Sequence, residues 1–198
     1  ADSGKEKGSG LARVYYNRGT GYLNLGRHKE AAADFDRAIE LRKDYAYAIY
    51  NRGLSLRHLG DYDRSAADFT VYLRLSPKEP ETYLARGRTY RLKGDYDRAI
   101  ADLNEYLRQK PDDAEAIHER GLAYQDKRDF PRAIAEFERM LKLKPQNYVA
   151  LVALGKLLSE QGDDKGALAK FDDAIRINPS SADLLIARGD VHAKLRDL

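Results

Sequence analysis

The sequence predicts an all-α fold built from repeated antiparallel pairs of helices, and three observations support this prediction. A six-residue pattern recurs five times along the 198 residues at a constant spacing of 34, without an insertion or deletion. Apolar and small residues recur at helical spacing within each unit, and glycine and proline recur at fixed places between these runs. The pattern starts at Gly26, Gly60, Gly94, Arg128 and Gly162. A single helical hairpin leaves one face uncovered, so units of this length become stable when they stack.

The spacing fixes a frame of repeats. Five full repeats cover 12–45, 46–79, 80–113, 114–147 and 148–181, and an incomplete sixth predicts a terminal helix over 182–195. We expect 12–198 to form a single domain, because the length suits one ordinary domain. Residues 1–11 lie outside the frame and consist mainly of glycine, serine and charged residues, so we expect them to form a flexible leader.

Each repeat predicts two helices. In the first helix, positions 4, 8 and 11 are apolar or small, as in Tyr15, Gly19 and Tyr22, and they share one helical face. Glycine at position 15 tolerates the left-handed conformation that ends this helix, and aspartate at position 16 can cap the second helix. Proline at position 32 then ends the second helix in four repeats.

The second helix combines a small residue at position 20 with a bulky one at position 24. The bulky residues are Phe35, Phe69, Leu103, Phe137 and Phe171. Small residues at positions 8 and 20 allow the two helices of a repeat to approach closely, and the large residue at position 24 fills the space beside them.

These recurring positions resemble the tetratricopeptide repeat (TPR) family, and the resemblance covers residues 12–198. It implies a right-handed α-solenoid whose concave groove is lined by positions 2, 5, 9, 12 and 13 of each repeat. Two features depart from the family pattern. Position 7, usually aliphatic, is arginine in five of six units, and position 27, usually small, is Tyr72, Tyr106 or Met140 in the middle repeats.

The arginines at position 7 predict structural ion pairs with the acids at position 23 of the same repeat. The pairs are Arg18 with Asp34, Arg52 with Asp68, Arg86 with Asp102, and Arg120 with Glu136. The fifth repeat changes both positions together, to Leu154 and Lys170. Both positions are eight residues from the turn at position 15, so they lie level across an antiparallel hairpin. We therefore expect these arginines to be satisfied within the fold and to take no part in ligand binding.

Composition excludes several classes of protein. With 35 basic and 32 acidic residues interspersed, the net charge is only +3, which does not indicate a dedicated nucleic-acid binder. The absence of cysteine excludes disulfides and thiolate chemistry and is compatible with both a cytoplasmic and a periplasmic or secreted location. The longest apolar run is far shorter than the roughly 18 to 20 residues that span a bilayer, so membrane insertion is not expected.

The residue pattern also argues against an enzyme. The four histidines occupy different repeat positions, and none has another histidine three or four residues away, so no metal pair is expected. The glycines lie in helical hairpins and form no phosphate-binding loop between a strand and a helix. Acids at positions 16, 23 and 25 are interpreted as caps and solvated faces. We expect no catalytic residue, no metal and no cofactor.

The implied groove predicts a partner-binding surface in the first three repeats. Tyr16, Tyr47 and Tyr50 stand at groove positions 2 and 5, where a tyrosine offers a rigid apolar face and a polar tip. The candidate binding residues are Arg13, Tyr16, Asn24, Tyr47, Tyr50, Asn51, Arg57, His58, Arg88 and Arg91. Of the residues that form the family's carboxylate clamp for peptide C-termini, only Asn51 matches, so that binding mode is disfavoured.

The later repeats predict a groove of different charge. Their charged and histidine residues at the groove positions are Glu115, His118, Asp126, Glu160, Asp183 and Asp190, with Lys156 and Lys194. The groove is therefore expected to be basic and aromatic in the first three repeats and acidic in the later ones.

The sequence thus indicates a non-enzymatic scaffold that binds a peptide or helix of a partner protein in its groove. Two alternatives stay open: a recruiting or regulatory domain of a larger enzyme, and nucleic-acid binding through the basic groove of the first three repeats. The terminal helix keeps Leu184, Leu185, Ile186 and Val191, where a capping helix would turn polar. This fits a fragment of a longer repeat protein, and its exposed face is expected to promote self-association.

Overall fold

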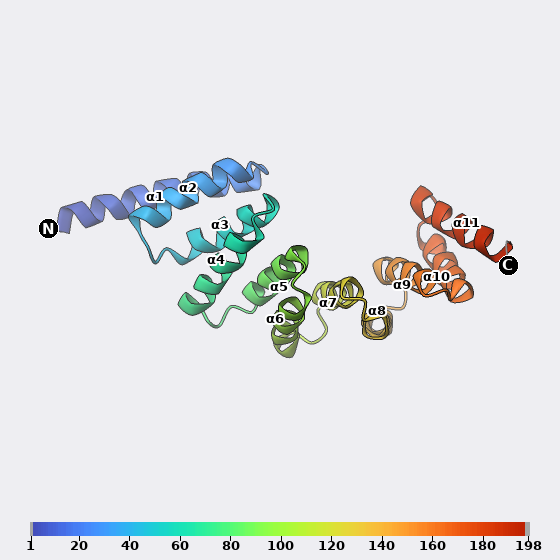
Figure 1. Ribbon diagram of the computed structural model, residues 1–198. Coiled ribbons are helices and arrows are strands. Elements are labelled where there is room, and N and C mark those ends of the chain that lie inside the picture. The colour runs from blue at the N-terminus through green and yellow to red at the C-terminus, as the bar shows by residue number, and fades with distance from the viewer. Residues whose placement is uncertain (1, 197–198) are drawn as a thin grey trace. The chain divides into compact units, whose positions relative to one another are not determined.

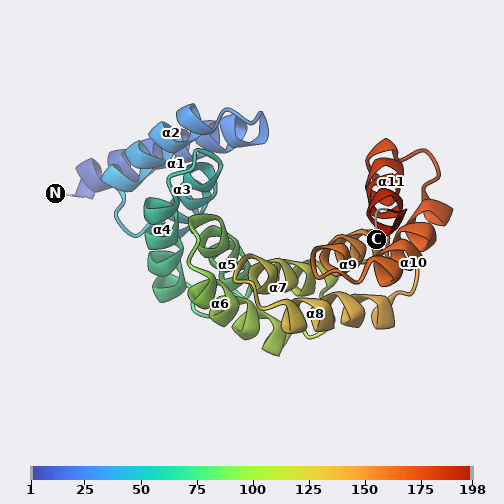
Figure 2. The same cartoon turned by 45° about the vertical axis from the view of Figure 1, so that its right-hand side comes forward.

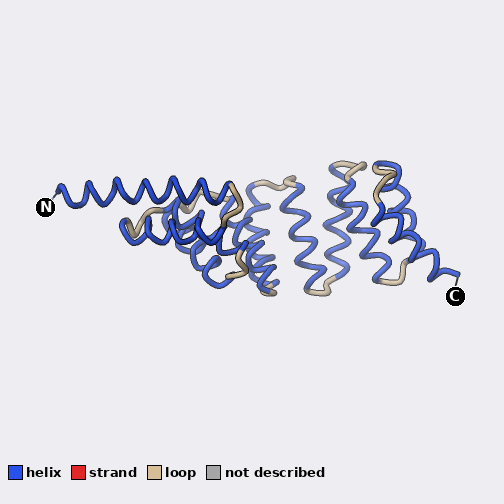
Figure 3. The backbone as a smooth tube through the Cα atoms, turned by 90° about the horizontal axis from the view of Figure 1, so that it is seen from above, coloured by secondary structure: helices blue, strands red, loops and turns tan. Residues whose placement is uncertain are grey.

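The computed structural model describes residues 2–196, and within them it contains eleven helices and no strand (Figure 1). The helices are α1 (Asp2–Asn24), α2 (His28–Leu41), α3 (Ala46–His58), α4 (Tyr62–Leu75), α5 (Glu81–Lys93), α6 (Tyr96–Gln109), α7 (Ala114–Asp126), α8 (Phe130–Leu143), α9 (Tyr148–Glu160), α10 (Asp164–Ile177) and α11 (Ala182–Arg196). Short loops join them (Figure 3). The all-α class is therefore confirmed.

The helices follow the predicted period closely. Helices α7, α9 and α11 begin at Ala114, Tyr148 and Ala182, each at the first position of its repeat. The terminal helix expected over 182–195 is α11, which ends one residue later. The frame of 34 residues that was taken from the sequence is therefore the frame of the helix pairs.

The turn inside each repeat has the geometry that the sequence predicts. Gly26, Gly60, Gly94 and Gly162 have positive φ angles between 70° and 86°, and Arg128 takes the equivalent conformation at 65° in the fourth repeat. A left-handed residue at this place is the common end of a helix, and glycine adopts it without steric cost.

The aspartates after these turns cap the second helices. The side chains of Asp61, Asp95, Asp129 and Asp163 each accept a hydrogen bond from the backbone N–H three residues further on. Each bond satisfies one of the amides that a helix start leaves without an intrahelical partner. The first repeat has Arg27 at this position and no side-chain cap.

The segment expected to be a flexible leader is helical over residues 2–11, and its flexibility stays a prediction. Helix α1 already begins at Asp2, so residues 2–11 continue the first helix of the first repeat. Extending a helix that already exists costs less than starting a new one, and no proline interrupts this segment. The packed part of the helix still begins where the repeat frame begins, because Ala12 is fully buried while Ser9, Gly10 and Leu11 are exposed.

The chain divides into two compact units, and the single domain over 12–198 stays a prediction. The first unit ends at Gln109 and the second begins at Lys110, between the third and fourth repeats. In the first unit each helix from α1 to α6 packs on the next, and in the second unit the same holds from α7 to α11 (Figure 2). Since each repeat contacts its neighbours and no distant one, a repeat array has no single central core that would tie all of it together.

The core of each repeat is built on the contact between positions 8 and 24. Phe35, Phe69, Leu103 and Phe137 have no exposed surface, and Phe171 is 1% exposed. A Cβ atom built on Gly121 would lie 2.7 Å from the Phe137 ring, and one on Gly155 would lie 2.5 Å from the Phe171 ring. A side chain at Gly121 or Gly155 would therefore collide with the residue that fills its repeat.

The terminal helix α11 buries one side and exposes another. Leu184 and Val191 are 2% exposed and pack in the core of the second unit, whereas Leu185 and Ile186 are 41% and 62% exposed. The exposed apolar face expected from the sequence is therefore present on α11. Self-association through it stays a prediction.

Candidate binding surfaces

The arginines at position 7 form the ion pairs that the sequence predicts. Their N–O distances are 2.7 Å for Arg18–Asp34, 2.6 Å for Arg52–Asp68, 2.8 Å for Arg86–Asp102 and 2.7 Å for Arg120–Glu136. In the first three pairs the guanidinium donates through two nitrogens to the two carboxylate oxygens. A bidentate arginine–carboxylate pair fixes both side chains, so these arginines belong to the structure of the repeat.

These arginines also reach back to the preceding repeat, which the sequence analysis missed. Arg52 donates to Asp36 at 2.6 Å, and Arg86 donates to the Thr70 hydroxyl at 2.9 Å. Arg188 pairs with Asp172 in the same way at 3.1 Å. Each of these partners occupies position 25, so the recurrence of a short polar side chain there was the signal that could have revealed this contact.

Burial disfavours the charged form of both members of such a pair: it lowers the pKa of the arginine and raises the pKa of the aspartate. The hydrogen bond that Arg52 donates to Asp68 raises the pKa of Arg52, so the guanidinium stays charged. Burial raises the pKa of the Asp68 carboxyl, and the Arg52 guanidinium works against that rise. The carboxylate therefore depends on its arginine for most of its stabilisation, because little water reaches it.

Two of the predicted groove tyrosines lie together on α3. Tyr50 is half-buried, with its ring 5.4 Å from the Phe69 ring and 5.0 Å from the Tyr72 ring. Tyr47 is 62% exposed, and its ring lies 6.4 Å from that of Tyr72. The ring of Tyr72, whose presence at position 27 departs from the family pattern, thus lies next to the rings of both tyrosines.

Positive and negative charges surround Tyr50. Burial raises the pKa of Tyr50, and so do the charges of Glu81 and Glu79, while Arg57 and Arg88 lower it. Arg57 lies on α3 with Tyr50, and Arg88 lies on α5. The Arg57 guanidinium also donates to the Ala85 carbonyl on α5, at 3.5 Å. Tyr50 is therefore subject to the charges of two arginines and two acids.

The remaining candidates on α1 lie at a different place in the first unit. The Tyr16 ring packs 4.9 Å from the Tyr45 ring and 6.1 Å from the Phe35 ring. Arg13 lines a cavity of about 340 Å³ with Ser9, Gly10, Arg42 and Tyr45. Tyr45 therefore contacts Tyr16 and shares a cavity with Arg13, so these three residues form a second basic and aromatic surface. Asn24 is exposed at the last residue of α1.

His58 and Asn51 have structural partners. The His58 ring stacks on His28 of α2, with centroids 4.2 Å apart and the planes parallel. Burial lowers the pKa of His58, and so do the charges of His28 and Arg57. The backbone carbonyl of Asn51 accepts a hydrogen bond from the Ser55 hydroxyl within α3, and the residue is half-buried. Arg91 lies half-buried on α5.

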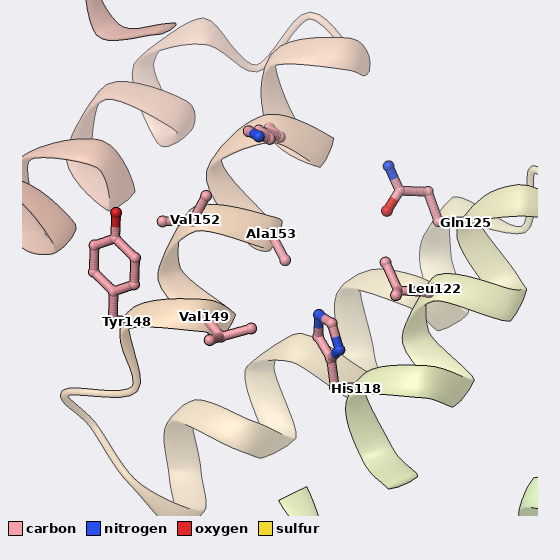
Figure 4. Close-up of a pocket in the computed structure, with 8 residues that line it drawn as sticks. His118, Leu122, Gln125, Tyr148, Val149, Val152 and Ala153 are labelled. Carbon is pink, nitrogen blue, oxygen red and sulfur yellow. The ribbon is translucent and has the colours of Figure 1, made fainter. Parts of the chain in front are cut away.

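The second unit contains a cavity of about 370 Å³ between α7 and α9, which the sequence analysis did not predict. Its lining residues are His118, Leu122, Gln125, Tyr148, Val149, Val152, Ala153 and Lys156. Figure 4 shows Val149 and Ala153 on α9 facing His118 and Leu122 on α7. The Tyr148 hydroxyl is hydrogen-bonded to the Ser181 side chain at 3.1 Å, which fixes one end of the wall.

This cavity differs from the acidic groove expected for the later repeats. Glu115, Asp126, Glu160, Asp183 and Asp190 are all exposed, as expected, but none of them lines the cavity. The acidic groove was predicted from the charged residues at the groove positions, and the apolar residues at those positions were not considered. The signal was present, because Leu122, Val149 and Val152 occupy positions 9, 2 and 5 of their repeats.

Among residues 2–196, no group of three or more histidine, cysteine, aspartate or glutamate side chains is arranged to hold a metal ion. No helix described here combines the length and apolar character that a membrane span requires.

The chain matches known family models and solved structures. A model described as "Tetratricopeptide repeat" matches residues 16–80 and 118–182, more than half of the chain, and a model described as "TPR repeat" matches 87–128. A comparison with curated proteins finds no match.

Three solved structures illustrate the likeness in fold. MamA 41-end from Desulfovibrio magneticus RS-1 is 24% identical with a TM-score of 0.78, covering 87% of this chain and 97% of that one. A tetratricopeptide repeat protein from Parabacteroides merdae ATCC 43184 is 19% identical with a TM-score of 0.81, covering 93% of this chain and 73% of that one. YrrB, described as a TPR protein with an unusual peptide-binding site, is 21% identical with a TM-score of 0.71, covering 88% of this chain and 90% of that one.

Proposed function

Because the chain belongs to the tetratricopeptide repeat family, we propose that it is a non-enzymatic scaffold that holds a peptide segment of a partner protein on its first unit. The binding surface is formed by groove positions of α3 and α5, with Tyr47, Tyr50, Arg57 and Arg88 at its centre. Helices of this family present such positions along one face, where an extended chain can contact several repeats at once.

The observation that carries this proposal is the packing of Tyr50. Its ring rests against Phe69 and Tyr72, and Arg57 and Arg88 act on it electrostatically. A tyrosine that is held in place before binding loses little conformational entropy when a partner covers it, which is why tyrosine and arginine dominate binding hot spots. The neighbouring Tyr47, 62% exposed, adds apolar surface for the same partner.

The similar structures favour a peptide as the form of the partner. YrrB is described as having an unusual peptide-binding site. That statement belongs to YrrB, and at such low identity it supports this chain only through the shared fold. The shared fold therefore favours a segment of a partner protein over a small molecule as the ligand of this chain.

Nucleic-acid binding through the same surface is the weaker alternative. Arg18, Arg52 and Arg86 are each paired with a carboxylate of the fold, so their positive charges are less available to attract a phosphate backbone. Phosphate binding by the remaining arginines would fall steeply with salt concentration, whereas aromatic anchoring of a peptide would not. A salt titration of any ligand found therefore separates the two readings.

The test compares ligand capture by the intact chain and by groove variants. Tyr47→Ala and Arg57→Glu should each weaken the affinity for a captured protein by about 1 to 3 kcal/mol, as for hot-spot residues, with unchanged helix content. Arg74→Glu on α4 and Tyr62→Ala at the start of that helix are matched controls outside the surface, and they should bind like wild type. Equal affinity of wild type and both groove variants would contradict the proposal.

A further inference from the structure

We propose that the cavity between α7 and α9 is a second binding site, which takes a large aliphatic side chain of a partner protein together with an adjacent carboxylate. The aliphatic group would enter the apolar part of the cavity, and the carboxylate would bind Lys156. This site lies in the second unit, so it stands or fails separately from the function proposed for the first unit.

The walls of the cavity define the apolar half of the ligand. Leu122 and Val152 are half-buried, Ala153 faces α7, and Val149 is 49% exposed although it is a valine (Figure 4). A volume of about 370 Å³ is within the range of sites that hold a small organic group. Filling it with an aliphatic side chain removes apolar surface from water on both partners, which is the main favourable contribution to such contacts.

Lys156 defines the charged half. It is the one residue with a fixed charge among those that line the cavity, its side chain is exposed, and it forms no ion pair with any described residue. Even Glu160, one helical turn further along α9, does not pair with it. An ammonium group beside apolar surface attracts an anion more strongly than one in open water, because the surroundings screen the charge less.

The other charges nearby restrict where the carboxylate can be. Glu115 and Asp126 lie exposed at the two ends of α7, and Glu160 lies at the last residue of α9. A second acid of the partner near the end of α9 would be repelled by Glu160. A single acid next to the aliphatic residue meets Lys156, so the surface selects by repulsion as well as by attraction.

The described chain itself offers one segment with related chemistry. Ile186 on α11 is 62% exposed, and Asp183 and Asp190 lie on the same helix three and four residues away. The proposal names a separate partner with a single acid, because a second copy would bring two acids to a cavity whose lining holds one fixed positive charge. A second copy is therefore a competing occupant that the experiment must detect.

The experiment titrates the isotopically labelled full chain with capped tetrapeptides and follows its amide resonances by NMR. The probe is acetyl-Gly-Glu-Leu-Gly-amide, and the comparison peptides replace Glu with Gln, or Leu with Ala. We expect the probe to shift resonances of α7 and α9. The Gln peptide should bind about two- to fivefold more weakly, the factor for an exposed ion pair, and the Ala peptide should lose most of the binding.

Variants assign these preferences to residues. Lys156→Gln should make the Glu and Gln peptides bind equally while the preference for Leu over Ala remains. Val149→Asp, at an exposed position, should weaken all the peptides. The controls are Lys165→Gln on α10 and Val14→Asp on α1, which exchange exposed residues of the same types away from the cavity and should change nothing.

Three results would overturn the inference. The first is equal binding of the Glu and Gln peptides to wild type, and the second is a Glu preference that survives Lys156→Gln. The third is association of the protein alone, measured by sedimentation, that Lys156→Gln abolishes, because it would assign the cavity to a second copy. Loss of Tyr47 should not affect any of these measurements, so failure here and failure of the proposed function are distinguishable.

Discussion

Replacement of Arg86 by leucine tests whether the arginines at position 7 are part of the structure. Arg86 donates through two nitrogens to Asp102, each at 2.8 Å, and through a third to the Thr70 hydroxyl at 2.9 Å. The side chains of the pair are only 17% and 9% exposed. Leucine would leave the Asp102 carboxylate buried without a counter-charge.

The expected cost follows from this burial. Removing one partner of a buried ion pair destabilises a protein by about 3 to 5 kcal/mol, because the remaining charge is neither hydrated nor paired. Because Arg86 and Asp102 keep some exposure, we expect a loss of unfolding free energy at the lower end of this range, about 3 kcal/mol. Urea unfolding followed by far-UV circular dichroism measures it, and amide hydrogen exchange assigns the loss to α5 and α6.

The fifth repeat provides the matched control. It carries Leu154 and Lys170 at the same two positions, and Leu154 is 1% exposed there. The double variant Arg86→Leu/Asp102→Lys should therefore recover most of the stability that Arg86→Leu loses. A single variant within about 1 kcal/mol of wild type, the size of an exposed pair, would refute the reasoning, and so would a double variant no more stable than the single one.

Acid gives an independent check on the same variant. Burial already raises the pKa of Asp102, and Arg86 opposes that rise. Without Arg86 the pKa rises further, so the folded state of the variant binds a proton more readily than the unfolded state. Stability contributed by that proton is present below the ordinary pKa of aspartate, about 4, and is lost as the pH rises through the folded value. The difference in unfolding free energy between the Arg86→Leu variant and the wild type should therefore become smaller toward low pH.

Three other changes have predictable outcomes. Gly155→Ala should lower thermal stability despite the better helix propensity of alanine, because the new methyl group would lie 2.5 Å from the buried Phe171 ring, and an unchanged melting temperature would contradict this packing. Asp129→Ala should cost about 1 kcal/mol in denaturant unfolding through loss of the α8 cap. The pKa of His58 is lowered in the fold, so its contribution to stability is present above the ordinary histidine value of about 6.5 and is lost as the pH falls through the folded value. His58→Phe, which keeps an aromatic ring on His28, should reduce the loss of stability on acidification, and an identical pH profile would argue against the stacked pair as its cause.

The sequence by itself determined the interactions that repeat within one helical hairpin. The glycine turns, the aspartate caps, the contact of Gly155 with Phe171, and the pairing of Arg86 with Asp102 all join positions at a constant separation in the chain. Such contacts can be predicted because five copies of the pattern vary around one geometry, and the exchange of Arg and acid for Leu154 and Lys170 shows which positions meet.

Only the tertiary structure decided the features that depend on neighbouring repeats. The second hydrogen bond of Arg52 to Asp36, the support of Tyr50 by Tyr72, and the cavity beside Val149 all depend on how far side chains reach and how closely adjacent helices pack. The division after Gln109 depends on the same packing. A periodic sequence determines each hairpin through local contacts, but the surface that a partner meets is formed where differing side chains of successive hairpins come together, and the repeat pattern does not specify that arrangement.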